Sequence, residues 1–313
     1  MNDSEILCVG EVLWDALPAG LFLGGAPFNV ACHLRAAGLP AAMVSRIGND
    51  RLGTEIVRRA AKYGVNTDLV QVDDTLPTGF VCVSLDETGS AAYDIVAPAA
   101  WDAIVLDTEL QRRANAARAI VFGSLAQRNA ASRATIERLW ETDTIKVFDA
   151  NLRPPFDDRE VVTRSLAHAD IVKLSHVELQ QLTRWFSLPK AIGAAAAAIG
   201  EQFGCGTVCV TRAEHGAALW REGKWTEHPG FEVEVRDTVG AGDAFLAVLL
   251  AGLLNGAPDA SVLQHANMIG AYVATQFGAV PMDQGATTPR DRPPAPAARS
   301  KAAAKGRASG GKR

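Results

Sequence analysis

The stretch RDTVGAGDAFLAVLLAGLL, residues 236–254, joins a glycine turn to a strongly apolar helix. Gly240, Ala241 and Gly242 carry little or no side chain, so a ligand can come close to the unpaired N–H groups that begin the helix. Such groups form a binding site for an anion such as a phosphate. Asp243 follows at once, and a carboxylate beside an anion site makes chemical sense if an acceptor hydroxyl between the two must lose its proton. The alternative is that the glycines only tighten a turn and Asp243 complements the helix dipole.

The rest of the chain surrounds this stretch with a regular alternation of strands and helices. Six short apolar runs predict strands, and most are followed by a segment with helical periodicity; the runs are EILCVG, AAMVSRIG, AIVFGS, IKVFDAN, DIVKLS and TVCVTR. Almost continuously apolar strands that alternate with helices indicate a parallel sheet covered on both faces. We therefore expect an α/β fold whose ligands bind at the carboxyl ends of the strands.

Two stretches break this alternation. Residues 11–24 and 72–100 alternate apolar and polar side chains and contain turn signals such as Pro18 and Gly20. They are typical of half-exposed antiparallel strands. We expect them to form a small sheet that stands off the main domain as a lid, and its exposed strands suggest a homodimer that pairs through the lid.

The last 24 residues, 290–313, differ from the body of the chain. They hold 8 Lys or Arg and one acid among Ala, Pro, Gly and Ser, which predicts a disordered basic tail. The remaining residues include 23 basic and 34 acidic side chains, a formal charge of −11. Bulk nucleic-acid binding by the folded part is therefore not expected. The tail reads as a solvated extension or as a segment that touches anionic partners.

Cysteine usage and the N-terminus bear on the cellular compartment. The five cysteines are odd in number, scattered, and mostly embedded in apolar runs, so they read as reduced core thiols rather than disulfides or zinc ligands. No basic residue precedes Arg35, which is unlike a secretory signal. The longest apolar run, residues 244–254, is too short to span a bilayer. We expect a cytoplasmic protein without a membrane partner.

Two motifs carry a resemblance to a known family. DTVGAGDAF, residues 237–245, closely resembles the C-terminal signature of the ribokinase-like (PfkB) carbohydrate kinases, and GGAPFNVACHLRAAG, residues 24–38, resembles their Gly-Gly segment. The resemblance runs from about residue 5 to residue 283. It implies a kinase domain over residues 1–289, a three-layer α/β/α sandwich with a mostly parallel sheet and a β-sheet lid. It also implies that Asp243 is the catalytic base.

The same resemblance suggests which residues hold a sugar. Gly24 and Gly25 would admit it, Asn29 would bond a hydroxyl, and Asp15 would accept from two vicinal hydroxyls. Without the resemblance, Asp15 would read as an exposed turn residue. Further candidates for shaping the pocket are Phe80, Tyr93, Gln127, Arg128 and Arg153. Arg153 ends a predicted strand together with Asp149 and Asn151, which could equally form a structural polar cluster.

Four segments look most like those of bacterial fructokinases: GGAP, GSLAQRN, FDANLR and AYVATQFGAVP. Ribokinase itself typically carries GGKGAN, from which Pro27 departs. Fructose is therefore the expected acceptor. The alternatives are a kinase for 2-keto-3-deoxygluconate, ribose or a nucleoside, where Arg153 could serve an acid sugar, and a weakened sugar-binding regulatory protein.

The nucleotide site is expected to lack a Walker loop, because no GxxxxGK[ST] motif occurs in the chain. The family's Asn-x-x-Glu motif, which organises hydrated magnesium, becomes Ser175 and Glu178 here, so that Glu178 would hold Mg²⁺ through water. Thr211 and Gly216 match the segment that covers the ATP phosphates, but Ala213 replaces its first glycine. An added methyl matters if the backbone there needs positive φ.

Two more features follow from the resemblance. Asp237 and the carbonyl of Val239 match the site at which many family members bind a monovalent cation, so activation by K⁺ is expected, with further ligands from the loop near residues 278–281. Residues 264–275 are similar to the helix that flanks adenine, and Asn267 is the contact expected there.

Overall fold

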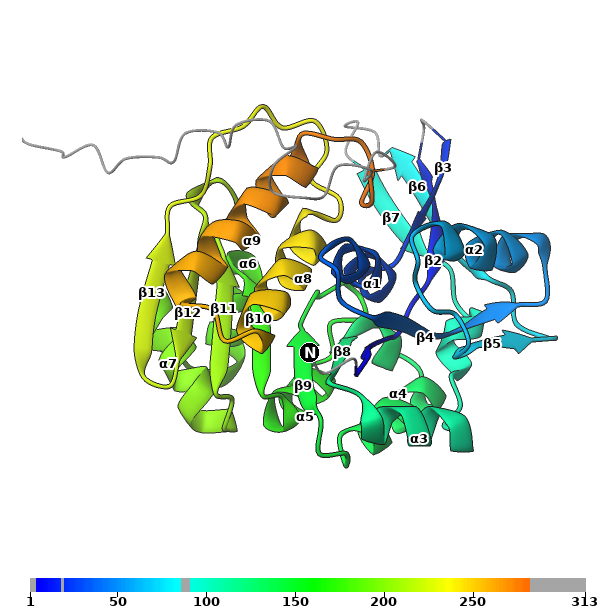
Figure 1. Ribbon diagram of the computed structural model, residues 1–313, viewed down its shortest axis with the longest axis horizontal. Coiled ribbons are helices and arrows are strands. Elements are labelled where there is room, and N and C mark those ends of the chain that lie inside the picture. The colour runs from blue at the N-terminus through cyan, green and yellow to red at the C-terminus, as the bar shows by residue number, and fades with distance from the viewer. Residues whose placement is uncertain (1–3, 18–19, 86–90, 282–313) are drawn as a thin grey trace, which may run out of the picture.

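The computed structural model describes residues 4–17, 20–85 and 91–281 (Figure 1). Its central sheet has nine strands in the order β13-β12-β11-β10-β9-β8-β1-β4-β5. The strands are β1 (Ile6–Val9), β4 (Ala41–Gly48), β5 (Val70–Asp73), β8 (Ala119–Gly123), β9 (Ile145–Asp149), β10 (Ile171–Ser175), β11 (Thr207–Thr211), β12 (Ala217–Arg221) and β13 (Lys224–His228). Only β12 and β13 pair antiparallel to their neighbours, so the sheet is mostly parallel, and all six predicted strands are confirmed.

Alternate residues of each strand pack into two separate cores. On β1, Leu7 and Val9 lie in one core, while Ile6 and Cys8 lie in the other. All four are at most 1% exposed, because side chains of successive strand residues point to opposite faces. The sheet is therefore buried on both faces, as the apolar runs predict.

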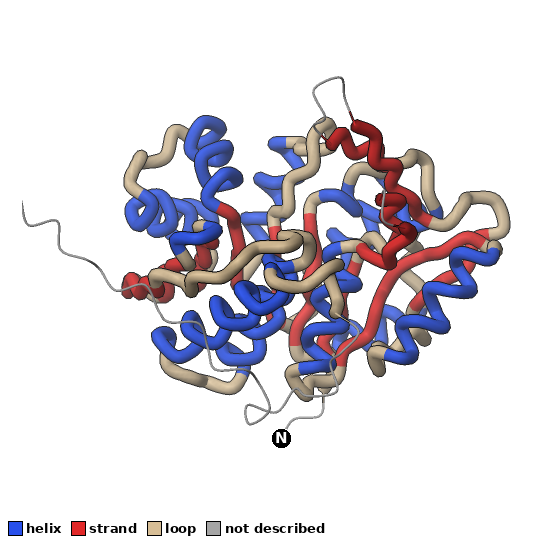
Figure 2. Tube along the Cα trace, turned by 90° about the horizontal axis from the view of Figure 1, so that it is seen from above, coloured by secondary structure: helices blue, strands red, loops and turns tan. Residues whose placement is uncertain are grey.

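Helices cover both faces and complete three layers (Figures 1 and 2). One face carries α1 (Ala26–Ala36), α2 (Arg51–Lys62), α8 (Ala241–Leu254) and α9 (Asp259–Ala274). The other carries α3 (Thr108–Ala116), α4 (Ala130–Leu139), α5 (Arg159–His168), α6 (His176–Phe186) and α7 (Ile192–Phe203). Helix α8 packs on both α1 and α9 and begins on the side of the molecule where the small second sheet stands (Figure 1).

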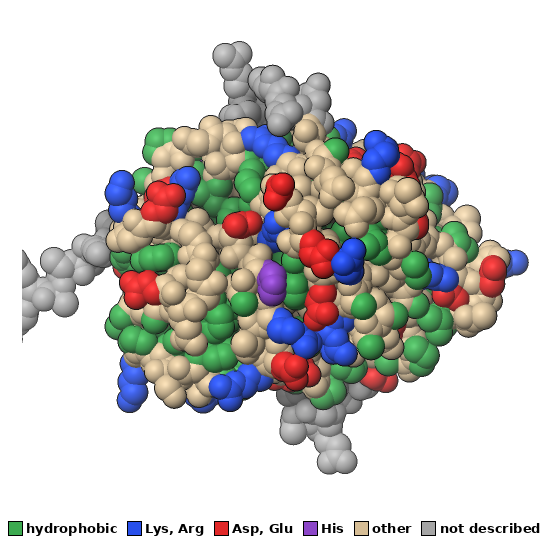
Figure 3. All heavy atoms as spheres, turned by 90° about the horizontal axis from the view of Figure 1, so that it is seen from below, with side chains coloured by type: hydrophobic (Ala, Val, Ile, Leu, Met, Phe, Trp, Pro, Cys, Tyr) green, Lys and Arg blue, Asp and Glu red, His purple; other side chains and the backbone are tan. Residues whose placement is uncertain are grey.

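Three short 3-10 helices complete the described elements: η1 (Ala100–Ala103), η2 (Leu125–Gln127) and η3 (Ala213–His215). On the face seen from below in Figure 3, acidic and basic side chains lie intermingled, with neither sign dominating.

The small second sheet, here called the lid, has the order β3-β2-β6-β7 and is separate from the central sheet. Its strands are β2 (Leu13–Leu17), β3 (Gly20–Gly24), β6 (Gly79–Leu85) and β7 (Ala91–Ile95). Both predicted stretches contribute to it, but β2 and β6 pair in parallel rather than antiparallel. The predicted boundary is also too wide, because residues 72–73 belong to β5 in the central sheet and residues 99–100 are buried in the core.

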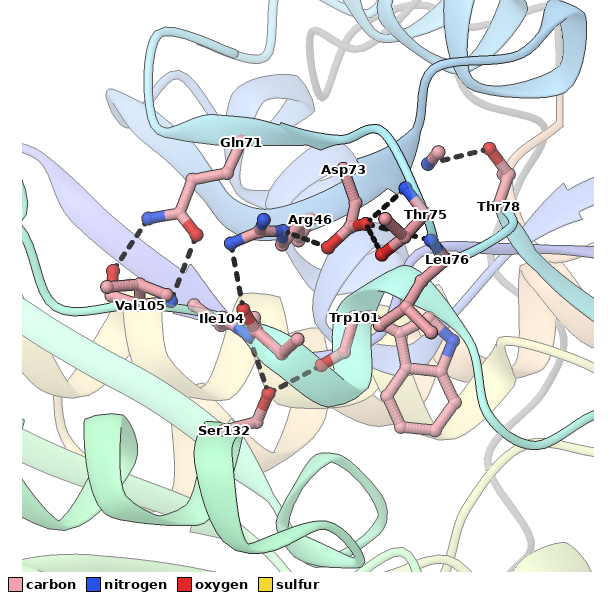
Figure 4. Close-up of polar contacts among 12 residues, drawn as sticks. Arg46, Gln71, Asp73, Thr75, Leu76, Thr78, Trp101, Ile104, Val105 and Ser132 are labelled. Atoms are coloured by element: carbon pink, nitrogen blue, oxygen red, sulfur yellow. Dashed lines mark hydrogen bonds and ion pairs between the residues drawn. The ribbon is translucent and has the colours of Figure 1, made fainter.

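A polar network fixes the chain where it leaves the central sheet for the lid (Figure 4). One Asp73 oxygen accepts the backbone N–H groups of Thr75 and Leu76, each at 2.8 Å, and the other pairs with Arg46 Nε at 2.8 Å. Thr78 Oγ1 accepts from Gly48 N at 3.0 Å. These contacts hold the segment that leads into β6 against β4, so the start of this lid strand is fixed to the central sheet.

Candidate active site

The turn that begins α8, residues 239–243, is shaped by glycine. Gly240 has φ of 76°, and a side chain there would bring Cβ within 2.5 Å of Ala279 Cα. Only glycine fits this left-handed and crowded position. Ala241 N donates to Thr238 O at 3.3 Å, whereas the N–H groups of Gly242 and Asp243 have no acceptor among the described residues. The α8 turn thus leaves two backbone donors open at the positive end of a helix.

Asp243 and Asn29 meet at this turn. Asn29 Nδ2 donates to Asp243 Oδ2 at 2.8 Å, which joins α1 to α8 across 214 residues of sequence. Asn29 is 4% exposed, and its Oδ1 has no partner among the described residues. One Asp243 oxygen is therefore held, and the half-buried carboxylate keeps its other oxygen for a further donor.

Close packing surrounds both glycines of the Gly-Gly segment, and at Gly25 the neighbour is backbone. Gly25 is the N-cap of α1 at φ 108°, and a side chain there would overlap the carbonyl oxygen of Glu11. A Cβ on Gly24 would overlap Asp15 Oδ2. Burial raises the pKa of Asp15 to about 6, and the charge of Arg153 partly offsets this effect. Asp15, Gly24 and Gly25 are therefore brought together.

Glu11 is a buried acid that sequence reasoning missed. It is 2% exposed, and its Oε2 has no hydrogen-bond partner among the described residues. Burial raises its pKa to about 7; Arg153 works against this shift, and the nearby Asp243 adds to it. Its signal in the sequence is an acid placed just after the buried strand β1.

Lys173 and Asp149 form a buried ion pair that sequence reasoning also missed as a pair. Lys173 Nζ lies 3.1 Å and 3.0 Å from the two Asp149 oxygens, and the side chains are 7% and 6% exposed. Burial raises the pKa of Asp149 to about 6 against the effect of Lys173, with Glu178 and Asp243 adding to the rise. The only sequence signal for Lys173 is a lysine inside the apolar run DIVKLS.

Ser175 and Glu178 form a capping box at the start of α6. Ser175 Oγ accepts from Glu178 N at 3.2 Å, and Glu178 Oε2 accepts from Ser175 N at 2.6 Å. Glu178 Oε1 also accepts from Leu152 N at 2.9 Å. Serine is a favoured N-cap, so this departure from the Asn-x-x-Glu pattern has a structural reason. The signature Ser-x-x-Glu was readable from the sequence.

Asp237 and His33 fix the loop that packs on the α8 turn. Asp237 accepts from Val239 N at 2.9 Å and from Gly278 N at 3.0 Å. His33 is 5% exposed, and its Nε2 lies 2.9 Å from Ala279 O. Burial lowers the pKa of His33. The structure brings Asp237, Val239 and the 278–281 loop together, as the resemblance implies.

The segment expected over the ATP phosphates is backbone-constrained. Ala213 has φ of 49° and Gly216 has φ of 77°. A side chain on Gly216 would overlap His228 O, so glycine is required there. Thr211 ends β11, and its Oγ1 lies 3.4 Å from Leu174 O.

The residue expected beside adenine, Asn267, is 8% exposed on α9 and donates to Leu263 O at 2.7 Å.

Two further sugar candidates, Gln127 and Arg128, make hydrogen bonds with other protein groups. Gln127 is 0% exposed, and its Nε2 donates to Gly123 O and to Ser165 Oγ on α5, both at 2.9 Å. Arg128 is paired with Asp102 under the lid. The Arg128 donors are taken up by protein groups, so we leave Arg128 out of the sugar site proposed below. Gln127 Oε1 has no partner among the described residues, and a contact of Gln127 with the sugar stays a prediction.

The other candidates are placed as follows. Arg153 is exposed and close enough to Asp15 and Glu11 to lower their pKa values. Phe80 lies on β6 and packs against the core on the α1 face. Tyr93 belongs to β7, but its side chain lies outside the described residues.

No group of three or more His, Cys, Asp or Glu side chains in the described part of the chain is arranged to hold a metal ion. No helix within the same residues is long and apolar enough to cross a membrane.

Comparison with known proteins gives consistent matches. The profile of the pfkB family carbohydrate kinases matches residues 10–284. A fructokinase from Klebsiella pneumoniae is 30% identical, over 89% of this chain and 95% of its own. The crystal structure of fructokinase with bound ATP from Xylella fastidiosa is 26% identical and covers 90% of this chain and 94% of its own, at a TM-score of 0.77. A double mutant of the Vibrio cholerae fructokinase, in a form with fructose, ADP and potassium ion bound, is 27% identical at 0.77 and covers 89% and 94%.

Proposed function

The chain belongs to the pfkB family of carbohydrate kinases, and we propose that it transfers the γ-phosphoryl group of ATP to the primary hydroxyl of fructose. Similarity to fructokinases extends over about nine-tenths of the chain in the Klebsiella and Xylella comparisons. Those relatives support fructose as the acceptor, and their names describe what they themselves bind.

Asp243 is the general base in this proposal. Its contact with Asn29 is the observation that carries the assignment, because the 2.8 Å bond to Oδ2 orients the carboxylate and leaves Oδ1 to accept the hydroxyl proton. The oxygen that loses this proton then attacks the γ-phosphorus in line, and ADP leaves.

The α8 turn supplies the charge stabilisation. The N–H groups of Gly242 and Asp243, which have no acceptor among the described residues, would donate to the oxygens of the transferred group. Preorganised donors of this kind need no rearrangement as negative charge shifts in the transition state. Gly240 and Ala241 shape the turn, so the whole segment Gly240–Asp243 belongs to the proposed site.

Asp15, Gly24, Gly25 and Asn29 form the proposed sugar side, with Arg153 beside them. A carboxylate can accept from two vicinal hydroxyls, and the missing side chain at Gly24 leaves Asp15 Oδ2 room. Burial raises the pKa of Asp15 to about 6, which is still below neutral pH. The ionised form of Asp15 therefore prevails at neutral pH. Tyr93 stays a candidate on β7.

The donor set fits magnesium only through water. Each Glu178 oxygen accepts one backbone N–H and keeps lone pairs for water, and Ser175 is engaged as the helix cap. Bound Mg²⁺ would neutralise phosphate charge. Thr211 and Gly216 would lie near the phosphates, and Asn267 near adenine, as the resemblance implies.

Potassium fits the Asp237 loop less directly, because both Asp237 oxygens already accept backbone N–H groups. Carbonyl oxygens such as that of Val239 would therefore supply the ligands. We propose that K⁺ binds in this way and activates the enzyme.

The arrangement of the chain suits this activity. We propose that residues 1–289 act as one kinase domain, that the lid closes over the sugar and excludes water, and that two chains pair through the lid. Residues 282–313, which include the expected tail, lie outside the described residues. Four of the five free cysteines are buried, which suits the expected cytoplasmic location.

A coupled assay of ADP release tests the acceptor. Fructose, 2-keto-3-deoxygluconate, ribose and nucleosides are compared with and without K⁺, and fructose should give the highest kcat/KM. A dominant response to another acceptor overturns the fructose assignment. Tight sugar binding in calorimetry without turnover would favour a weakened sugar-binding protein instead.

A further inference from the structure

We propose that Lys173 is a positioning residue for phosphoryl transfer: its ammonium, held by Asp149 behind Gly242, adds a fixed positive charge to the α8 turn. The inference rests on the proposed place of the transferred phosphoryl group at that turn. It goes beyond it by giving a role to a side chain that no part of the proposed mechanism uses.

Strand register places Lys173 on the face of the sheet that α8 covers. Its flanking residues Val172 and Leu174 pack in the opposite core, so Lys173 points towards α1, α8 and α9. Asp149 on β9 and Cys209 on β11 are its cross-strand partners. The lysine therefore sits between a carboxylate and a thiol, beneath the start of α8.

The absence of a side chain at Gly242 leaves space for the Lys173 ammonium. A Cβ built on Gly242 would lie 3.2 Å from Lys173 Nζ, with no other side chain as near. Gly242 has no left-handed φ that would explain its glycine, unlike Gly240. The missing side chain at Gly242 lets the charge approach the backbone N–H groups that the proposed phosphate site uses.

The pair is arranged to keep its charge. An ammonium has three donors, and both hydrogen bonds of Lys173 go to Asp149; no third acceptor is found among the described residues. Burial lowers the pKa of Lys173, but the carboxylates of Asp149, Glu178 and Asp243 more than offset this and hold it above its ordinary value. Lys173 is thus a permanent cation at neutral pH, with one donor to spare.

Such a charge has a direct use in phosphoryl transfer. The α8 turn must hold an anion close to Asp243, Asp149 and Glu178, three carboxylates that all influence Lys173. A fixed cation behind the turn counters their repulsion and acts most strongly where water is excluded. Its loss should therefore lower kcat more than it changes sugar binding.

The test neutralises both members of the pair in the full chain. The double variant K173M/D149N leaves no lone buried charge, so it should fold. We expect kcat to fall about 10²-fold, the scale for losing one charge-stabilising group, with KM for the sugar within about threefold of the parent. A folded double variant with kcat within about threefold of the parent overturns the proposal.

The matched control is R128M/D102N, which neutralises the other fully buried pair in the same way. It should leave kcat per folded molecule unchanged, since that pair lies outside the proposed site. An equal loss of kcat in both double variants means a general effect of core polarity and also overturns the proposal.

A pH profile of Asp149→Asn gives a reading that packing alone would not move. Without Asp149, the pKa of Lys173 should fall, because burial still lowers it and the largest opposing charge is gone. The pH profile of kcat should then show a new decrease as pH rises. The groups that face Lys173 are Asp149, Cys209, Glu178 and Asp243, and burial raises the pKa of Cys209 to about 12, above the range of the profile. An unchanged profile in a folded variant counts against the proposal.

Asp243→Asn separates this inference from the proposed function. If Asp243→Asn loses turnover while K173M/D149N keeps it, the Lys173 inference alone fails. If Asp243→Asn keeps turnover, the proposed site at the α8 turn fails first.

Discussion

The two most buried ion pairs in the described part of the chain use their donors in opposite ways. Arg128 binds Asp102 through two bonds of 2.8 Å, with side chains 5% and 3% exposed, and also donates to the Ile95 and Val96 carbonyls. Its guanidinium stacks 3.9 Å from the centre of the Trp101 ring. Lys173 bonds only Asp149 among the described residues and lies against a glycine.

The Arg128 pair therefore stabilises the packing of the chain, whereas the Lys173 pair keeps a positive charge and an unused donor. The Arg128 pair ties the strand that leaves the lid to the core, and its donors are spent on protein atoms. The Lys173 pair faces a backbone turn with open N–H groups, where a spare donor and a net positive charge have a use. Changes near the Lys173 pair should therefore lower turnover, whereas changes to the Arg128 pair should lower stability.

Asp243→Asn should have the largest effect, because it removes the base beside the Lys173 pair. We expect kcat to fall by about 10² to 10⁴ while ATP affinity, measured by calorimetry, stays near that of the parent. The amide is nearly isosteric, so folding should persist. A kcat within about tenfold of the parent would exclude Asp243 as the base.

Arg128→Met should act on stability rather than on chemistry. It leaves Asp102 buried without its partner, which costs about 3–5 kcal/mol of unfolding free energy. Urea unfolding measures the loss, and kinetics on the folded fraction should show an unchanged KM for the sugar. A KM raised more than tenfold at unchanged stability would return Arg128 to the sugar pocket.

Glu11→Gln tests a buried acid that, unlike Asp102 and Asp149, forms no ion pair among the described residues. Burial raises the pKa of Glu11 from its ordinary value of 4.5 to about 7 in the folded state, so between these pH values the folded state holds more protons than the unfolded state. Stability therefore falls as pH rises from about 4.5 to 7, by at most about 3 kcal/mol, and stays low above that.

Glu11→Gln should remove this fall, so that the variant gains on the parent at pH 8 but not at pH 4.5. Chemical unfolding at the two pH values measures it. Parallel pH dependence in both proteins would mean that Glu11 titrates normally.

The sequence predicted the parts of this contrast that depend on local pattern. The buried strands and the lid stretches followed from side-chain periodicity, and the α8 turn followed from Gly240 and Asp243. Lys173 and Asp149 are 24 residues apart, and only the register of β9 against β10 makes them neighbours.

The side-chain partners of Gln127 and Arg128 could not be read from the sequence for the same reason. Their motif placed them near a strand end, but the distant residues Ser165 and Asp102 decide where their side chains go. Ser175 shows the reverse case, because its capping partner Glu178 is only three residues away and the pattern could have been read. Long-range pairing, rather than local preference, was what the sequence left open.

Ala213→Gly should have the smallest effect, and it asks whether strain near the proposed phosphate segment is structural or functional. Ala213 has φ of 49°, where a residue with a Cβ pays about 1 kcal/mol, so glycine should stabilise the fold by about that amount. Glu222→Gly is the matched control, because Glu222 has φ of 48° at the exposed turn between β12 and β13.

If the two sites differ only in strain, both variants gain similar stability in urea unfolding and neither changes KM for ATP. If the backbone at Ala213 approaches the phosphates, the glycine variant alone should lower KM for ATP, by a few-fold, because the methyl no longer limits that approach. A lowered KM for ATP in both variants, or a loss of stability in Ala213→Gly, would contradict this explanation. The positive φ at Ala213 would then not distinguish the proposed phosphate segment from the turn at Glu222.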